Sequence, residues 1–126
     1  MAKSQARSVR KVSGKIYRAY RKKKKYELGR EPAFTSIGEK KLRDTRIRGG
    51  NQKLKLLSID KINVYDSKSG TFKQAKIKTV IENQANRHFI RRNIITKGCI
   101  LDTELGKVKV TSRPGQEGIL NGILVA

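Results

Sequence analysis

A-K-I-K-T-V-I, at residues 75–81, is the stretch that decides the fold of the second half of the chain. Side chains of a β-strand point alternately to opposite faces, so apolar residues at every second position line one face. Here Lys76 and Lys78 fall on the opposite face. We therefore predict a half-buried strand that turns its lysines toward water. The side chains expected on its other, core face are Ala75, Ile77, Thr79 and Ile81.

The same alternation recurs on both sides of this strand. Leu54 and Leu56 alternate with lysines, and so do Val108 and Val110. Further strand-like runs lie at residues 62–65, 87–95, 99–101 and 119–125. About seven short strands at near-regular spacing, without a convincing helix, indicate an all-β fold. Because the spacing is too short for parallel crossovers, we predict a small antiparallel β-barrel over residues 51–126.

Glycine and proline mark the expected turns of this body. D-S-K-S-G at residues 66–70 is a turn cluster, and R-P-G-Q at residues 113–116 has the pattern of a type II turn. Gly122 lies within the last apolar run, where we expect a bulge or bend in one closing strand.

The first half of the chain is dominated by S-G-K-I-Y-R-A-Y-R-K-K-K-K-Y-E-L-G-R, at residues 13–30. Its centre holds five adjacent cations, Arg21 to Lys25, which no core can bury unpaired because each would cost several kcal/mol. Residues 1–30 contain 12 basic residues and one acid, Glu27. Such a segment cannot bury enough apolar area to offset its ordering entropy. We expect a long, largely extended basic arm that is mobile without its partner, although the spacing over residues 16–25 also permits a short helix.

Residues 31–51 are expected to be a loop of extended character, and R-D-T-R-I-R-G-G-N-Q-K at residues 43–53 is its candidate binding stretch, called the Arg/Gly loop below. Arg43, Arg46 and Arg48 carry forked cations suited to bidentate phosphate contacts. Gly49 and Gly50 allow the backbone to approach a ligand closely. A flexible linker is the alternative, but three arginines beside two glycines favour a binding loop. We therefore divide the chain into a basic arm and loop, residues 1–50, and a barrel body.

The net charge of +21 arises from 31 Lys plus Arg against ten Asp plus Glu. Repulsion at this charge density favours a polyanionic partner, either nucleic acid or an acidic membrane. A membrane partner would call for a basic amphipathic helix, a lipidation signal or a long apolar run, and the sequence offers none of them. Tyrosines interleaved with Lys and Arg suit phosphates and unstacked bases instead. We expect a cytoplasmic nucleic-acid-binding protein.

Catalysis is not expected. Cys99 is the only cysteine and lies in an apolar run, and His88 is the only histidine. A Cys99–His88 pair is the one arrangement resembling a nucleophile with its base. No metal-ligand cluster and no phosphate-binding glycine motif is present. We expect no cofactor, no metal and no small-molecule substrate.

Three segments carry a resemblance to a known family: S-G-K followed by K-K-K-K-Y-E-L-G-R within residues 13–30, I-R-G-G-N-Q-K at 47–53, and V-T-S-R-P-G-Q-E-G at 110–118. The chain resembles the eighth e-type family of small-subunit ribosomal proteins, which archaea and eukaryotes share. Lys15 stands where the family often has a second small residue. The long insertion of eukaryotic members is absent, which makes the chain similar to the archaeal ones. The resemblance implies a β-barrel with an N-terminal extension along 16S-type ribosomal RNA.

Carried over by position, the resemblance implies that the arm and the Arg/Gly loop are the principal RNA contacts. Its glycines would permit close backbone approach, and its tyrosines would stack on bases. We expect Glu27 to orient Arg30 or Lys25, or to accept a hydrogen bond from a nucleotide, the alternative being a solvated acid without such a role. The implied RNA-binding residues are Lys3, Arg7, Arg10, Lys11, Gly14, Lys15, Tyr17, Arg18, Tyr20, Arg21, Lys22, Lys23, Lys24, Lys25, Tyr26, Gly29, Arg30, Arg43, Arg46, Arg48, Gly49, Gly50, Asn51 and Lys53, with Arg87, His88, Arg91, Arg92 and Arg113 as weaker candidates whose alternative is a solvated strand face.

Two hypotheses follow. The first is a structural constituent of the small ribosomal subunit, in contact with ribosomal RNA and neighbouring ribosomal proteins, that supports subunit assembly and translation. The second is a free nucleic-acid-binding protein, such as an RNA chaperone or a chromatin protein. Composition does not separate the two hypotheses, and the family motifs favour the first.

Overall fold

A computed structural model describes Ser4 and residues 7–125 of the 126-residue chain. Contacts between residues divide the chain into two compact units, residues 1–32 and 33–126. The first unit has one regular element among its described residues, the 3-10 turn η1 (Lys25–Glu27). The helix considered for residues 16–25 does not form, and the segment before η1 is irregular.

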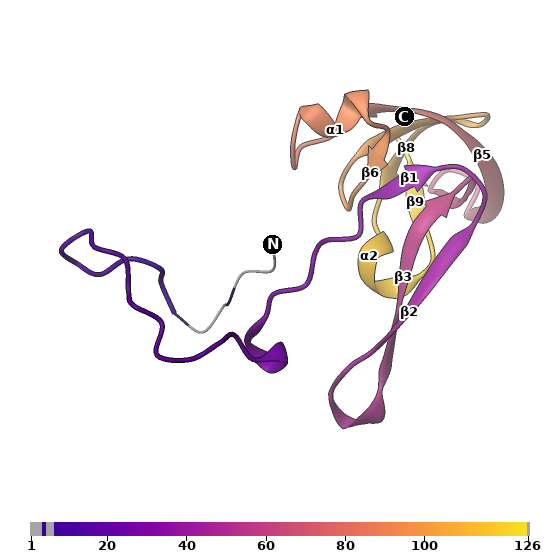
Figure 1. Ribbon diagram of the computed structural model, residues 1–126. Helices are drawn as coiled ribbons and strands as arrows, with labels where there is room; N and C mark the ends of the chain where they lie inside the picture. Colours follow the sequence, from indigo (N-terminus) through magenta and orange to yellow (C-terminus); the bar gives the residue numbers. More distant parts are fainter. Residues whose placement is uncertain (1–3, 5–6, 126) are drawn as a thin grey trace. The chain divides into compact units, whose positions relative to one another are not determined.

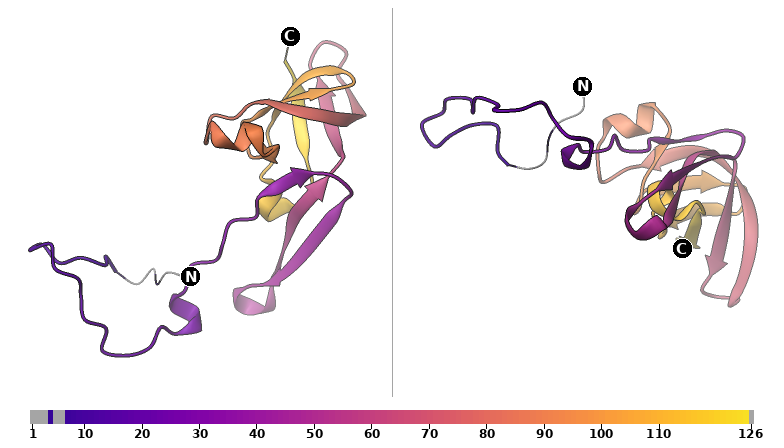
Figure 2. Two further views of the ribbon diagram at one scale, coloured as in Figure 1. Left: turned by 45° about the horizontal axis from the view of Figure 1, so that its top comes forward. Right: turned by 60° about the horizontal axis from the view of Figure 1, so that its bottom comes forward.

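The second unit is built of strands, as Figures 1 and 2 show, and its main element is a closed five-stranded barrel. In sheet order the barrel strands are β4 (Lys61–Asp66), β5 (Thr71–Glu82), β7 (Ile100–Thr103), β8 (Gly106–Val110) and β9 (Asn121–Leu124). The all-β class and the small barrel are confirmed. Their positions agree with the alternation in the sequence, because Ile62, Val64, Val108 and Val110 all face the core.

The barrel is not wholly antiparallel as predicted. Four of its pairings are antiparallel, but β4 and β9 pair in parallel, with Asn63 opposite Asn121. Consecutive strands alternate in direction, so the first and fifth strands of such a sheet point the same way. Closing an odd number of strands therefore requires one parallel pair. No crossover helix is needed, because the rest of the barrel connects the two strands.

A second sheet of four strands has the order β2-β3-β1-β6. Its strands are β1 (Thr35–Ile37), β2 (Lys41–Arg46), β3 (Gln52–Ile59) and β6 (Ile94–Ile95). Residues 35–46, expected as loop, thus form two strands, and β1 pairs with β3 in parallel. Long-range contacts explain the difference: the buried Thr35 hydroxyl donates a 2.6 Å hydrogen bond to the carbonyl oxygen of Leu56.

The core lies inside the barrel and beneath the second sheet. Its side chains are Leu56, Ile59, Ile62, Val64, Ala75, Ile77, Val80, Ile95, Cys99, Leu101, Val108, Val110 and Leu120. The prediction for β5 is correct for Ala75 and Ile77 and wrong for Thr79, which is exposed, and for Ile81, which is 42% exposed. The β5–β7 register shifts between Ile77 and Thr79. This irregularity reverses the alternation, so Val80 takes the core position in place of Ile81.

Two one-turn helices replace elements that were predicted differently. Residues 88–91, expected in a strand, form α1 (His88–Arg91) ahead of the short β6. The expected type II turn is α2 (Pro114–Glu117). Proline at the first turn is preset for a helix, and Gly118 ends α2 in the left-handed conformation, at φ 66°.

Gly122 lies inside the regular strand β9, and the expected bulge is absent there, since the pairings with β4 and β8 continue through it without a shift. A Cβ atom at this position would lie 2.5 Å from Cγ1 of Val108 and 2.9 Å from the carbonyl oxygen of Lys109. Glycine is therefore required by the close approach of the neighbouring strand.

Candidate nucleic-acid interface

The arm contains a small hairpin-like turn with the S-G-K motif at its tip. Arg10 and Ile16 form an antiparallel bridge, and the Lys11 N–H donates to the Lys15 carbonyl at 2.8 Å. Gly14 has φ 80°, a conformation that side chains disfavour, and its carbonyl accepts a 2.8 Å hydrogen bond from the Arg10 guanidinium. The motif thus forms a defined turn that presents Lys15 and the neighbouring basic residues to solvent.

The three tyrosines of the arm differ in their accessibility. Tyr17 is contacted by cations: the guanidinium carbon of Arg7 lies 4.0 Å from its ring centroid, and the Lys11 amino group lies 5.5 Å away. Tyr20 is 83% exposed and Tyr26 is 74% exposed, against 37% for Tyr17. The guanidinium carbon of Arg21 lies 5.2 Å from the Tyr20 centroid, but both Tyr20 and Tyr26 expose more surface than Tyr17 and are the more available for stacking.

Glu27 pairs with Arg21, which corrects the expected pairing with Arg30 or Lys25. The Arg21 guanidinium donates to the Glu27 carboxylate, whose second oxygen accepts from the Lys24 N–H at 3.4 Å. This carboxylate links the start of the basic run to η1. The side chains of the run, from Arg21 through Lys25, are all exposed. Glu27 therefore orients Arg21 at the start of the run, and the run as a whole keeps a net positive charge.

The Arg/Gly loop is the tip of the β2–β3 hairpin, visible at the lower end of the second unit in Figure 1. At the tip, the Ile47 N–H donates to the Asn51 carbonyl at 2.8 Å, and the 3-10 turn η2 (Arg48–Gly50) lies between them. Both glycines of this turn have positive φ, 70° and 74°. Gly49 and Gly50 are therefore needed for the turn of the hairpin itself, independently of any close approach to a ligand.

The hairpin register separates a basic face from an apolar one. Arg43 is directly opposite Lys55, and Thr45 is opposite Lys53, so these side chains share a face. The opposite face carries Leu42, Leu54 and Leu56 together with Asp44 and, nearer the tip, Arg46. Gly118 at the end of α2 packs against Leu54 and Leu42. The hairpin is thus anchored on α2 by this apolar contact and by a 3.4 Å hydrogen bond from Nζ of Lys53 to Oε1 of Gln116. On the basic face Arg43 is exposed and Lys55 is half-buried. Sequence reasoning missed Lys55, which the K-L-K-L alternation would have placed beside Lys53.

The weaker candidates form a separate group around α1. Arg87, His88, Arg91 and Arg92 are exposed, and the Arg92 guanidinium carbon lies 5.4 Å from the centroid of the Phe34 ring. Phe34 in turn packs edge-on against Phe89, with centroids 5.8 Å apart. Arg113 is exposed and lies apart from this group, at the start of α2. Lys3 lies outside the described residues.

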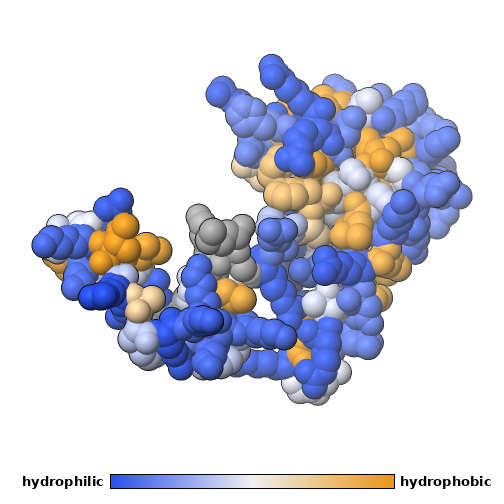
Figure 3. All heavy atoms as spheres, in the orientation of Figure 1, coloured by the Kyte–Doolittle hydropathy of each residue, from blue (hydrophilic) through white to orange (hydrophobic). Residues whose placement is uncertain are grey.

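The visible surface combines hydrophilic side chains with hydrophobic patches (Figure 3). Figure 3 shows hydrophilic side chains over most of the visible arm, interrupted by a hydrophobic cluster. Val9, Val12 and Ile16 are the exposed aliphatic residues of the arm. No helix in the described part of the chain is long and apolar enough to cross a membrane.

Cys99 does not have the environment of a nucleophile. It is 1% exposed, and burial raises the pKa of its thiol, which disfavours the reactive thiolate. His88 is exposed on α1. Across Ser4 and residues 7–125, no three His, Cys, Asp or Glu side chains gather into a group able to hold a metal.

Comparison with known proteins supports the resemblance over the whole chain. A family model described as "Ribosomal protein S8e" matches residues 4–125. The chain is 53% identical to the "Small ribosomal subunit protein eS8" of Nanoarchaeum equitans, over 96% of this chain and 95% of that protein. It is 52% identical to the protein of the same name from Methanobrevibacter smithii, over 99% and 100% of the two chains, and 47% identical to that of Methanocorpusculum labreanum, over 96% and 97%. Given this agreement along nearly its full length, the chain belongs to the ribosomal protein S8e family.

Proposed function

We propose that this chain is a structural constituent of the small ribosomal subunit that binds and stabilises 16S-type ribosomal RNA through its basic arm and its β2–β3 hairpin. Its archaeal relatives carry the name of small-subunit proteins, and the family is one of structural ribosomal components rather than enzymes. The partners in this proposal are small-subunit ribosomal RNA and neighbouring ribosomal proteins.

The observation that carries the proposal is the exposed basic run of the arm. A segment with five adjacent cations and a single acid nearby repels itself in water. Phosphates placed along it would relieve that repulsion and release their condensed counterions, which is favourable at physiological salt. The arm is then expected to order on RNA, because its own apolar contacts are few.

The hairpin contributes a second, preformed contact in this proposal. Arg43, Lys53 and Lys55 share one face of a β-ribbon that is anchored on α2 by the packing of Gly118 on Leu54 and Leu42 and by the hydrogen bond from Lys53 to Gln116. Cations held on a fixed scaffold bind phosphates without a further ordering cost. Contacts of this kind read the shape and backbone of folded RNA rather than its sequence.

Sedimentation of native lysate through sucrose gradients, at moderate and at high salt, tests the proposal. We expect the chain in the small-subunit peak, retained through a salt wash that removes loosely bound proteins. Detection at the top of the gradient, or spread over bulk nucleic acid, would refute the proposal in favour of a free nucleic-acid-binding protein.

A further inference from the structure

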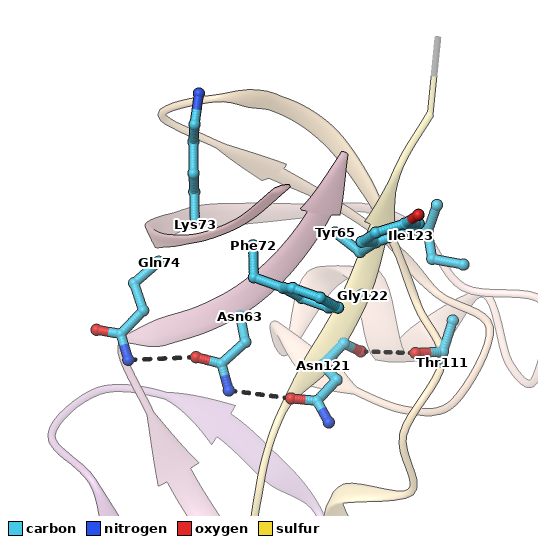
Figure 4. A pocket seen from close by; sticks show the side chains of 9 residues that line it. All are labelled: Asn63, Tyr65, Phe72, Lys73, Gln74, Thr111, Asn121, Gly122 and Ile123. Carbon is cyan, nitrogen blue, oxygen red and sulfur yellow. Dashed lines mark hydrogen bonds between the residues drawn. The ribbon is translucent and has the colours of Figure 1, made fainter. Parts of the chain in front are cut away.

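The outer face of the barrel carries two adjacent rows of side chains where β5, β4 and β9 lie side by side (Figure 4). In the β4 register, Tyr65 and Asn63 are two positions apart and point to the same face. Each has a direct neighbour on both flanking strands. The aromatic row consists of Phe72, Tyr65 and Ile123, and the amide row consists of Gln74, Asn63 and Asn121.

The aromatic row leaves a large ring open to solvent. The Phe72 and Tyr65 rings pack with centroids 4.9 Å apart and a 39° tilt between their planes. Despite this contact, 77% of Phe72 is exposed, whereas Tyr65 is half-buried. Packing between the two strands therefore accounts for the position of Tyr65. Most of the Phe72 side chain, in contrast, has no packing partner among the described residues and remains in contact with solvent.

The amide row is oriented by its own hydrogen bonds. Nε2 of Gln74 donates to Oδ1 of Asn63 at 3.2 Å, and Nδ2 of Asn63 donates to Oδ1 of Asn121 at 3.0 Å. This chain of bonds directs an acceptor, Oε1 of Gln74, to one end and a donor, Nδ2 of Asn121, to the other. Neither of these two atoms has a hydrogen-bond partner within the described part of the chain. The row thus presents a preorganised donor and acceptor to an incoming ligand.

The two rows line a concavity of about 650 Å³, within the size range of sites that bind small organic groups. Lys73 is the one charged residue of its lining, and its side chain points away from the amide row (Figure 4). Two positions beyond the amide row on the same outer face, Lys61 of β4 stands opposite Lys76 of β5. Lys109 of β8 stands opposite Ile123 of the aromatic row. Lysines therefore flank the concavity, with Asp66 near Lys73 as a neighbouring acid, and the lining itself contains no carboxylate.

We propose that this face of the barrel binds an unpaired nucleotide of RNA, with the base stacked on Phe72 and the edge of the base toward the amide row. A planar aromatic surface beside amide donors and acceptors matches the face and the edge of a base. The surrounding lysines match the phosphates on either side of that nucleotide. A protein partner would need acidic groups to meet these lysines.

This inference rests on the proposed RNA-binding function and extends it from backbone contacts to a base contact. NMR spectroscopy of the ¹⁵N-labelled full chain tests it directly, because the side-chain amide groups of Asn63, Gln74 and Asn121 give their own signals. The probes are the single-stranded hexanucleotides of adenosine and of uridine. A salt concentration of about 0.3 M weakens phosphate contacts and leaves stacking largely intact.

We expect these three amide signals to shift and saturate with at least one hexanucleotide. Phe72→Ala and Phe72→Leu should weaken binding at this site about 5- to 100-fold, the loss typical of removing one stacking platform. Both variants should fold normally, because the replaced ring is mostly exposed. Leu105→Ala is the control, since Leu105 is 44% exposed and does not line the concavity.

Three results would overturn the inference. If backbone signals of the arm and of the β2–β3 hairpin shift while the three side-chain amides stay still, the base site is refuted and the proposed function stands. If no signal responds either to the hexanucleotides or to small-subunit ribosomal RNA, both fail together. If the three amides respond to a neighbouring ribosomal protein and not to RNA, the face is a protein-binding surface instead.

Discussion

Replacing Gly122 by alanine should strain the barrel where β4, β8 and β9 meet. The added Cβ would lie 2.5 Å from Cγ1 of Val108, 2.9 Å from the carbonyl oxygen of Lys109 and 3.0 Å from Cδ1 of Ile62. Val108 and Ile62 are both fully buried, so neither side chain can move into open space. The carbonyl belongs to the strand paired with β9, so relieving that contact requires movement of the backbone itself.

Overpacking of this kind costs about 1–3 kcal/mol of unfolding free energy. The lower entropy of an alanine chain in the unfolded state offsets about 0.4–1 kcal/mol of a Gly→Ala change. The contact with a backbone oxygen places Gly122→Ala toward the upper end of the range, so we expect a net loss of about 2 kcal/mol. For a domain of roughly 100 residues this corresponds to a fall in Tm of about 8–16 °C.

Urea unfolding of the full chain, followed by far-UV circular dichroism, measures this loss. Gly115→Ala is the matched control, because its Cβ would meet Ala33 at an ordinary 3.6 Å and the position lies in the helix α2. We expect Gly115→Ala to leave the free energy of unfolding unchanged or to raise it slightly. Equal stability of Gly122→Ala and the unchanged protein would refute the packing argument for this glycine.

Three further predictions concern burial, charge and pH. Thr35→Val should lose the buried hydrogen bond to the Leu56 carbonyl and destabilise the protein by about 1–3 kcal/mol in the same urea assay, and a loss near zero would contradict the role given to this hydroxyl. Arg43→Ala and Lys55→Ala should each weaken binding to small-subunit RNA, and to a similar extent for all RNA sequences. Each should also lower the magnitude of the slope of log K against log salt concentration by about 1. An unchanged slope would show that the hairpin does not contact phosphates. The pKa of the Asp66 carboxyl is lowered, first by a hydrogen bond from the Lys68 N–H and then by one from the Ser69 hydroxyl. The ionised carboxylate therefore contributes to stability above its unfolded pKa of about 3.9. This contribution is lost as the pH falls through the lower pKa of the folded state. Asp66→Asn should flatten the acid limb of the stability curve, and an identical limb in both proteins would contradict this assignment.

Local patterns in the sequence predict the strands that form the barrel. The alternation at Ile62 and Val64, and again at Val108 and Val110, identifies core faces that the structure confirms. Irregularities within strands are less predictable, because they depend on the neighbouring strand. Nothing in the order of residues around Thr79 indicates that the register shifts there and moves the core position to Val80.

Elements fixed by long-range contacts could not be predicted either. The proline and glycine of residues 113–116 fit a turn as well as the first turn of a helix, and the packing of Gly118 on Leu54 accompanies the helix. In the same way, composition identifies Arg43 as a basic candidate, but only the β2–β3 register reveals that Lys55 stands opposite it. The aromatic row of Phe72, Tyr65 and Ile123 likewise could not be predicted, because its members come from three different strands that only the fold brings together.

The parallel closure of the barrel has a consequence for synthesis of the chain. Asn63 and Asn121, which meet in that closure, are 58 residues apart, so this contact raises the contact order of a fold whose other barrel pairings join residues closer in sequence. A ribosome adds about 5–20 residues per second, so β9 follows β4 after roughly 3–12 s. During this interval the nascent sheet has an unpaired edge that is open to other chains. Lys61 and the lysines on neighbouring strands place positive charge along that edge, and their mutual repulsion protects the unfinished barrel from aggregation until its last strand arrives.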